Sequence, residues 1–195
     1  MVSLSNHEVP ITMVEAEHIT FKPVDRRTWG DFEALFNGPG GPKFCWCMVW
    51  RATAEEGRGT TGAVRHEQMH GRVARGVPVG LLAYEEDSPI GWVSIAPRDT
   101  YRRLNGPEAQ PGEVIWSLAC MFTPRKRRGQ GLAHRLIAAA VDHARAQGAT
   151  VLEAYPVADD APSYRFMGFV SAFARAGFVE IARAGTRRHV MRLPL

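Results

Sequence analysis

A loop rich in glycine and arginine, Arg128-Gly-Gln-Gly-Leu-Ala133, has the residue types needed to bind an anion. Glycines let backbone N–H groups come close to a ligand, and a helix N-terminus adds partial positive charge. Arg125, Lys126 and Arg127 directly precede the loop and add formal charge. A dinucleotide fingerprint would need a glycine where His134 stands, and a Walker loop would need Gly-Lys before Ser or Thr. The residues therefore predict a local anion site of another kind.

The spacing of this loop resembles that of a known family. The pattern Arg-x-x-Gly-x-Ala at 128–133 resembles the acyl-coenzyme A loop of the GNAT N-acetyltransferase superfamily, although the preceding spacing from Pro124 is one residue longer than usual. The later segment Ala172–Phe178 resembles the family's second signature, a helix that ends at Gly-Phe. The resemblance extends from about residue 19 to the end of the chain. It implies acetyl-CoA as co-substrate, no metal, and transfer of an acetyl group directly to a primary amine.

The resemblance also implies where the cofactor would bind. In the family, the loop amides hold the CoA pyrophosphate, and the exposed backbone of the preceding strand pairs with the pantetheine arm. Carried over, the phosphate contacts are Arg127, Arg128, Gly129, Gln130, Gly131, Leu132 and Ala133. The pantetheine contacts are Cys120, Met121 and Phe122.

The candidate catalytic residues are less clearly marked. Acetyl transfer needs a neutral amine, a polarised thioester carbonyl and a proton for the departing thiolate. Many family members supply that proton from a Tyr at the position occupied here by Phe173. We therefore expect Tyr164 to replace it, with Tyr155 or water as open alternatives, and Glu113 to act as base, with Glu153 as a second candidate. A non-catalytic CoA-binding module is the other reading of Phe173.

The stretch Lys43–Arg51, KFCWCMVWR, concentrates aromatic and sulfur-containing residues. Its C-x-C pair lacks the further ligands of a closed zinc site, and cysteines so close rarely form a disulfide. In the family this region lines the acceptor side of the cleft, so we expect Trp46, Trp50 and Arg51 to bind substrate. Simple packing of the stretch is the alternative. Arg51 or Arg98 could bind an acceptor carboxylate, which favours an amino-acid-like small molecule.

A second motif points to a different class of enzyme. His66-Glu-Gln-Met-His70 matches H-E-x-x-H, in which two histidines on one helix face bind zinc and the glutamate polarises water. A third ligand would have to come from Glu85 or Glu86. A zinc-dependent hydrolase is therefore kept as the alternative, although no metal is expected.

The elements that position these residues follow from hydrophobic periodicity and turn residues. They read as a strand, two helices, three strands, a helix, a strand, a helix and a terminal strand pair. The apolar run 114–122 is expected as the central strand, and it feeds an amphipathic helix that ends at Gly148. We expect a flexible arm at 1–17 and one domain at 18–195 with a GNAT fold. That fold is α/β: a single mixed, mostly antiparallel, twisted sheet with a splayed central strand pair and flanking helices.

Composition limits the partners and the compartment. The chain is 45% hydrophobic, carries a net charge of +4, and has no apolar run near the roughly 18 to 20 residues that span a bilayer, so no membrane partner is expected. Its basic residues form no broad stripe, and nucleic acid is not an expected partner. An RNA-bound acceptor is the minor alternative, read from Arg183, Arg187, Arg188 and Arg192. Three cysteines and the absence of a signal-peptide pattern favour the cytoplasm. Because dimers are common in the family, a homodimer stays open.

Overall fold

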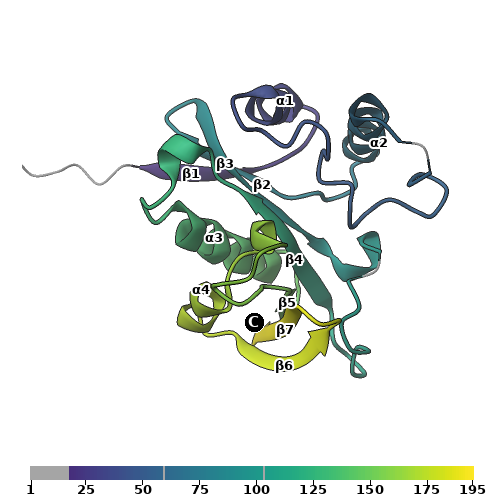
Figure 1. The fold of residues 1–195 in the computed structure, drawn as a ribbon, viewed down its shortest axis with the longest axis vertical. Helices are drawn as coiled ribbons and strands as arrows, with labels where there is room; N and C mark the ends of the chain where they lie inside the picture. Colours follow the sequence, from purple (N-terminus) through teal and green to yellow (C-terminus); the bar gives the residue numbers. More distant parts are fainter. Residues whose placement is uncertain (1–17, 59, 103) are drawn as a thin grey trace, which may run out of the picture.

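The structure, a computed structural model, describes residues 18–195 except positions 59 and 103, so the arm expected at 1–17 lies outside it. Seven strands in this part of the chain form one sheet in the order β1-β2-β3-β4-β5-β7-β6, flanked by helices (Figure 1). The strands are β1 (Ile19–Pro23), β2 (Leu81–Glu85), β3 (Ser88–Pro97), β4 (Ile115–Phe122), β5 (Val151–Ala154), β6 (Val179–Ala184) and β7 (Arg188–Pro194). The α-helices are α1 (Trp29–Asn37), α2 (Gly62–Ala74), α3 (Leu132–Ala146) and α4 (Val170–Arg175). Short 3₁₀ turns are η1 (Arg98–Thr100), η2 (Arg125–Arg127) and η3 (Arg165–Met167).

The predicted fold class is confirmed. Every pair of neighbouring strands is antiparallel except β4 and β5, which are parallel and are joined through α3. Helices α1 and α2 lie on one face of the sheet, and α3 and α4 lie on the other (Figure 1). Strand β4 is fourth of the seven, and its first five residues are buried because both faces are covered. This explains why its sequence is apolar at consecutive positions.

Two large groups of buried side chains hold the helices on the sheet. On the α3 face, Leu136, Ile137 and Ala140 pack against strand residues such as Leu118 and Leu152. On the α1 face, the core is aromatic and includes Trp29, Phe32, Phe36, Trp46 and Trp92. In the described residues, no helix is long and apolar enough to cross a bilayer. The fold thus places the end of β4 beside the loop that precedes α2.

Candidate functional site

The central pair of strands separates part of the way along β4. Strands β4 and β5 pair from Ile115 with Val151 as far as Leu118 with Ala154. Beyond this point β4 continues to Phe122, whereas the chain after β5 bonds elsewhere, with the Val157 N–H donating to Gly168 O at 3.0 Å. Among the described residues, no strand pairs with that edge of β4 beyond Leu118. Its backbone groups are therefore available to an extended ligand.

A β-bulge in β4 lies immediately after the last paired residue. Ser94 faces Cys120 and Ile95 faces Leu118, so Ala119 is an extra residue that has no partner of its own. An extra residue reverses the alternation of side chains along the strand. As a result, Cys120 and Phe122 pack with the core on the α1 face, whereas Leu118 belongs to the core on the α3 face. The bulge turns the end of β4 toward the stretch 43–51.

An apolar pocket of about 290 Å³ opens between these two segments. Its walls combine the residues expected to contact pantetheine with the stretch expected to bind the acceptor, although about 70 residues separate them along the chain. The lining consists of Pro42, Phe44, Cys45, Cys47, Val49, Trp50, Cys120, Met121, Phe122 and Phe166. A cavity of this size and apolar character is typical of a small-molecule site.

The two tryptophans expected in the pocket have different environments. Trp50 lines it, and its indole Nε1 is buried without a hydrogen-bond partner among the described residues. Trp46 is buried in the aromatic core, where its ring stacks on Phe36 with centroids 5.4 Å apart. Trp46 therefore packs behind the segment that carries Trp50 and does not line the pocket.

Arg51 does not face the pocket, which corrects the expectation that it binds substrate there. Its side chain is only 1% exposed. The guanidinium donates to Val79 O at 2.8 Å, Ser94 Oγ at 3.0 Å and Tyr101 OH at 2.7 Å. Burial raises the pKa of Tyr101 to about 12, so its hydroxyl stays protonated. These bonds make Arg51 an internal anchor for the chain that carries Trp50.

Three cysteines line the pocket, and their environments differ. The Cys120 thiol donates a hydrogen bond to the Cys47 sulfur, and with the Arg51 guanidinium and the Trp92 N–H it lowers the pKa of Cys47 to about 7, against the opposing effect of burial. The Trp92 Nε1 lies 3.3 Å from that sulfur. The same contact and burial raise the pKa of Cys120, and burial raises the pKa of Cys45. Cys47 is thus the pocket thiol most readily ionised.

The loop before α3 has the geometry of an anion cradle. Gly129 and Gly131 adopt positive φ angles of 78° and 77°, which a side chain would disfavour. No acceptor among the described residues bonds the backbone amides of positions 129 to 133. These amides lie at the N-terminus of a 15-residue helix, where partial positive charge favours an anion. The residues present therefore fit a pyrophosphate group.

The basic residues around this cradle are partly committed to the protein. Arg127 forms an ion pair with Glu85, and Arg128 Nε donates to Thr123 O at 3.3 Å. Arg125 and Lys126 border a second hollow, of about 590 Å³, between this loop and the end of α1. Basic side chains therefore lie close to the loop, and Arg127 and Arg128 also bond to the protein.

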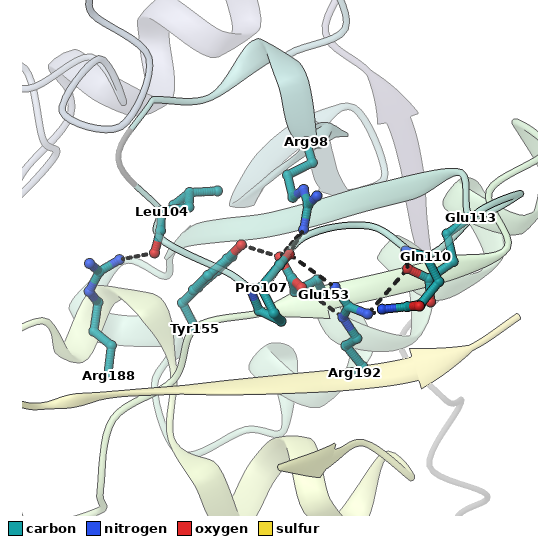
Figure 2. A network of polar contacts seen from close by, with 9 residues as sticks. All are labelled: Arg98, Leu104, Pro107, Gln110, Glu113, Glu153, Tyr155, Arg188 and Arg192. Atoms are coloured by element: carbon teal, nitrogen blue, oxygen red, sulfur yellow. Dashed lines mark hydrogen bonds and ion pairs between the residues drawn. The ribbon is translucent and has the colours of Figure 1, made fainter. Parts of the chain in front are cut away.

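The candidate bases belong to a polar network (Figure 2). Glu153 is buried on β5, accepts from Arg192 Nε at 2.8 Å and from Arg98 Nη1 at 3.4 Å, and is also bonded by the Tyr155 hydroxyl. Burial, followed by the charge of Glu153, raises the pKa of Tyr155. Glu153 thus compensates two arginines and has no solvent-facing lone pair to offer a substrate.

Glu113 lies at the opposite end of β4 from the pocket. It accepts from the Gln110 N–H at 2.8 Å and pairs with Arg192 at 3.3 Å (Figure 2). Five residues separate it from Leu118, where the strands part, and at about 3.3 Å per residue this is a distance of about 16 Å. The structure does not bring Glu113 together with the residues that line the pocket.

The candidate acids also differ in position. Tyr164 is 38% exposed, and its ring centroid lies 6.2 Å from that of Trp50 and 6.1 Å from that of Phe166, both of which line the pocket. Phe173, at the position of the family's usual acid, is buried edge-on against Phe178 with no polar group. Phe166 also lines the pocket, and its one signal in the sequence is that it is a large aromatic residue close to Tyr164.

The histidines of the H-E-x-x-H motif have partners within the protein. Nε2 of His66 lies 2.6 Å from Glu33, and its Nδ1 lies 3.1 Å from Glu67. His70 stacks on Trp29 with ring centroids 4.9 Å apart. Within residues 18–195, the two undescribed positions aside, no group of three or more His, Cys, Asp or Glu is placed to hold a metal ion.

Known proteins resemble this chain in sequence profile and in fold. The sequence profile of the acetyltransferase (GNAT) family matches residues 45–169, well over half of the chain. No curated protein matches.

Similar solved structures include a GNAT-family acetyltransferase from Streptococcus pneumoniae (15% identity, TM-score 0.53, covering 91% of this chain and 99% of that one). They also include ribosomal-protein-alanine N-acetyltransferase from Brucella melitensis (19%, 0.52, 90% and 99%). A third is yncA from Salmonella typhimurium with its cofactor acetyl-CoA (18%, 0.51, 91% and 94%). The chain therefore belongs to the acetyltransferase (GNAT) family and is an acyl-CoA N-acetyltransferase that uses acetyl-CoA.

Proposed function

We propose that the protein transfers an acetyl group from acetyl-CoA directly to the primary amine of a small, amino-acid-like molecule. The observation that carries this proposal is the apolar pocket of about 290 Å³ at the point where β4 and β5 separate. Its volume lies at the lower end of small-molecule sites, so it favours a compact acceptor. The cradle at 129–133 would hold the pyrophosphate, and the free edge of β4 would pair with pantetheine.

The chemistry assigned to this chain's residues follows from their positions. Free backbone N–H groups on β4 beyond Leu118 can donate to the thioester oxygen as negative charge develops there. Tyr164, whose ring lies beside that of the pocket residue Trp50, is our candidate to donate the proton that the departing thiolate needs. We assign Glu113 a structural role, since it is held by Arg192, and infer that the amine loses its proton to water.

Acetyl-CoA consumption measured against a library of small amines and N-terminal peptides tests the proposal. We expect a small amine to be the best acceptor, and preference for peptides would contradict this. Thermal shift provides an independent arm: acetyl-CoA should raise the melting temperature, whereas a zinc chelator should leave it unchanged. A fall with the chelator would support the hydrolase alternative. A shift with acetyl-CoA but no turnover would support a non-catalytic CoA-binding module.

We further infer a homodimer in a reducing compartment such as the cytoplasm. The edge strand β6 exposes Val179 and Ile181, and apolar side chains exposed on an edge strand favour association. The three cysteines are free thiols, which suits a reducing environment. Light scattering before and after Ile181→Lys tests the dimer, and a monomeric parent protein would contradict it.

A further inference from the structure

Arg188, the first residue of β7, is a nearly buried cation. It is 8% exposed, and its Nη1 donates to Leu104 O at 3.0 Å (Figure 2). Its guanidinium carbon lies 4.5 Å from the centroid of the Trp50 ring and 6.0 Å from that of Tyr155. Burial lowers the pKa of Arg188. The Trp50 ring thus lies within cation–π distance of the guanidinium, and the bond to Leu104 O further restrains it.

No carboxylate compensates this charge within the described part of the chain. No carboxylate oxygen of the described residues lies within 4.0 Å of a guanidinium nitrogen of Arg188. By contrast, Arg98 and Arg192 in the same region both pair with Glu153. Nε and Nη2 of Arg188 have no hydrogen-bond partner among the described residues and are not sealed from solvent. A buried charge without a partner is costly, and proteins normally pair it. Two donors on one edge of a guanidinium match the two oxygens of a carboxylate.

Arg188 itself lines a surface hollow that borders the proposed active site. The hollow, of about 310 Å³, is lined by Tyr164, Ala184, Gly185, Thr186, Arg187 and Arg188. Its walls, as far as the described residues form them, contain two arginines and no acid. Trp50 connects the two cavities, because it lines the apolar pocket and its ring contacts both Arg188 and Tyr164.

We propose that Arg188 binds a carboxylate of the acceptor, which makes the substrate a small amine that also carries a carboxylate. This inference rests on the proposed function. The carboxylate occupies the hollow beside Arg188, and the rest of the molecule passes Trp50 so that its amine reaches the end of β4. Arg188 thereby takes the role that the sequence had indicated for Arg51 or Arg98.

Equilibrium binding tests this site without requiring turnover. The probes are the N-acetyl derivatives of the twenty standard amino acids, each compared with its neutral C-terminal amide by calorimetry in the presence of CoA. We expect at least one acid to bind about 10- to 100-fold more tightly than its amide, the range for hydrogen bonds to a charged group. Arg188→Met should abolish this difference. Arg183→Met, which removes an exposed charge of the same hairpin, should keep it.

The outcomes separate the anion site from the proposed reaction. If no acid binds more tightly than its amide, or if Arg188→Met keeps the difference, the assignment of Arg188 is overturned. If Arg188→Met fails to fold, two other measurements test the anion site. The unmodified protein should bind the acid more tightly than the amide, and Arg188→Lys should bind the acid less tightly than the unmodified protein does. Carboxylate-dependent binding without acetyl transfer would overturn the proposed function alone, and transfer without any preference for acids would overturn the anion site alone.

Discussion

Alkylation of Cys47 by iodoacetamide should follow a titration curve with its midpoint near pH 7. The Cys120 thiol, the Arg51 guanidinium and the Trp92 N–H all stabilise the Cys47 thiolate and lower its pKa from 9.0 to about 7. Cys47 is 7% exposed and lines the pocket, so the reagent must reach it through the pocket. Because the folded pKa is lowered, the reactivity should be present above pH 7 and should fall about tenfold per pH unit well below it.

The size of the effect follows from two opposing factors. At pH 7 a thiol with a pKa of 7 is about half ionised, whereas one with a pKa of 9 is about 1% ionised, a gain of about 50-fold. Intrinsic nucleophilicity falls with pKa with a Brønsted coefficient of about 0.4 to 0.5, which over two pKa units is a loss of about tenfold. With equal access, Cys47 should therefore react about fivefold faster at pH 7 than an ordinary thiol.

The assay is mass spectrometry of the alkylated peptide in a Cys45→Ala background, across pH 5 to 10. Cys120→Ala should move the midpoint upward toward 9, because it removes the largest cause of the lowered pKa. Saturating acetyl-CoA should slow the reaction if it occupies the pocket. A midpoint near 9 in the parent protein, or one that Cys120→Ala leaves unchanged, would refute the electrostatic reasoning.

Three further substitutions test the site and its support. Gly168→Ala should lower the free energy of unfolding by roughly 2 to 4 kcal/mol in urea titrations, since φ is +84° and the new Cβ would lie 2.7 Å from both Met121 and Phe173 atoms; an unchanged midpoint would contradict this packing. Glu113→Gln should leave the acetyl-transfer rate within about twofold and should lower the free energy of unfolding by about 1 kcal/mol or less. A large loss of rate would instead support Glu113 as the catalytic base. Tyr164→Phe should lower kcat about 100-fold without changing the KM for acetyl-CoA, the range for loss of a general acid. A kcat equal to that of the unmodified protein would exclude Tyr164 as the general acid.

The features that the sequence predicted are those set by local pattern. The apolar run of β4 and the stripe of α3 depend on periodicity, and the loop at 128–133 depends on glycines that adopt positive φ. Each of these features is formed by residues that lie close together in the sequence, so a local pattern is enough to predict it. They were sufficient to predict that the loop at 128–133 joins the central strand to an amphipathic helix.

The features that were not predicted depend on contacts between distant segments. In the sequence, Arg51 follows two tryptophans and resembles a pocket residue, yet its partners Ser94 and Tyr101 come from later segments. The sequence groups Arg188 with other C-terminal arginines. It does not show that Arg192 pairs with two carboxylates whereas Arg188 pairs with none among the described residues. The position of Glu113 could have been predicted from topology. The C-terminal end of β4 leads to the loop at 128–133, so a residue that precedes β4 lies at the opposite end of the strand.

The composition of the stretch 43–51 follows from the turn that it makes. Trp46 and Cys47 both have positive φ, at 47° and 56°, which costs roughly 1 to 2 kcal/mol for each residue. The turn directs Cys47 and Trp50 to the pocket while Trp46 packs into the aromatic core. Burial of a tryptophan on one side and three hydrogen bonds from Arg51 on the other offset this strain. The aromatic and basic residues in KFCWCMVWR therefore hold a strained wall between the apolar pocket and the hollow beside Arg188.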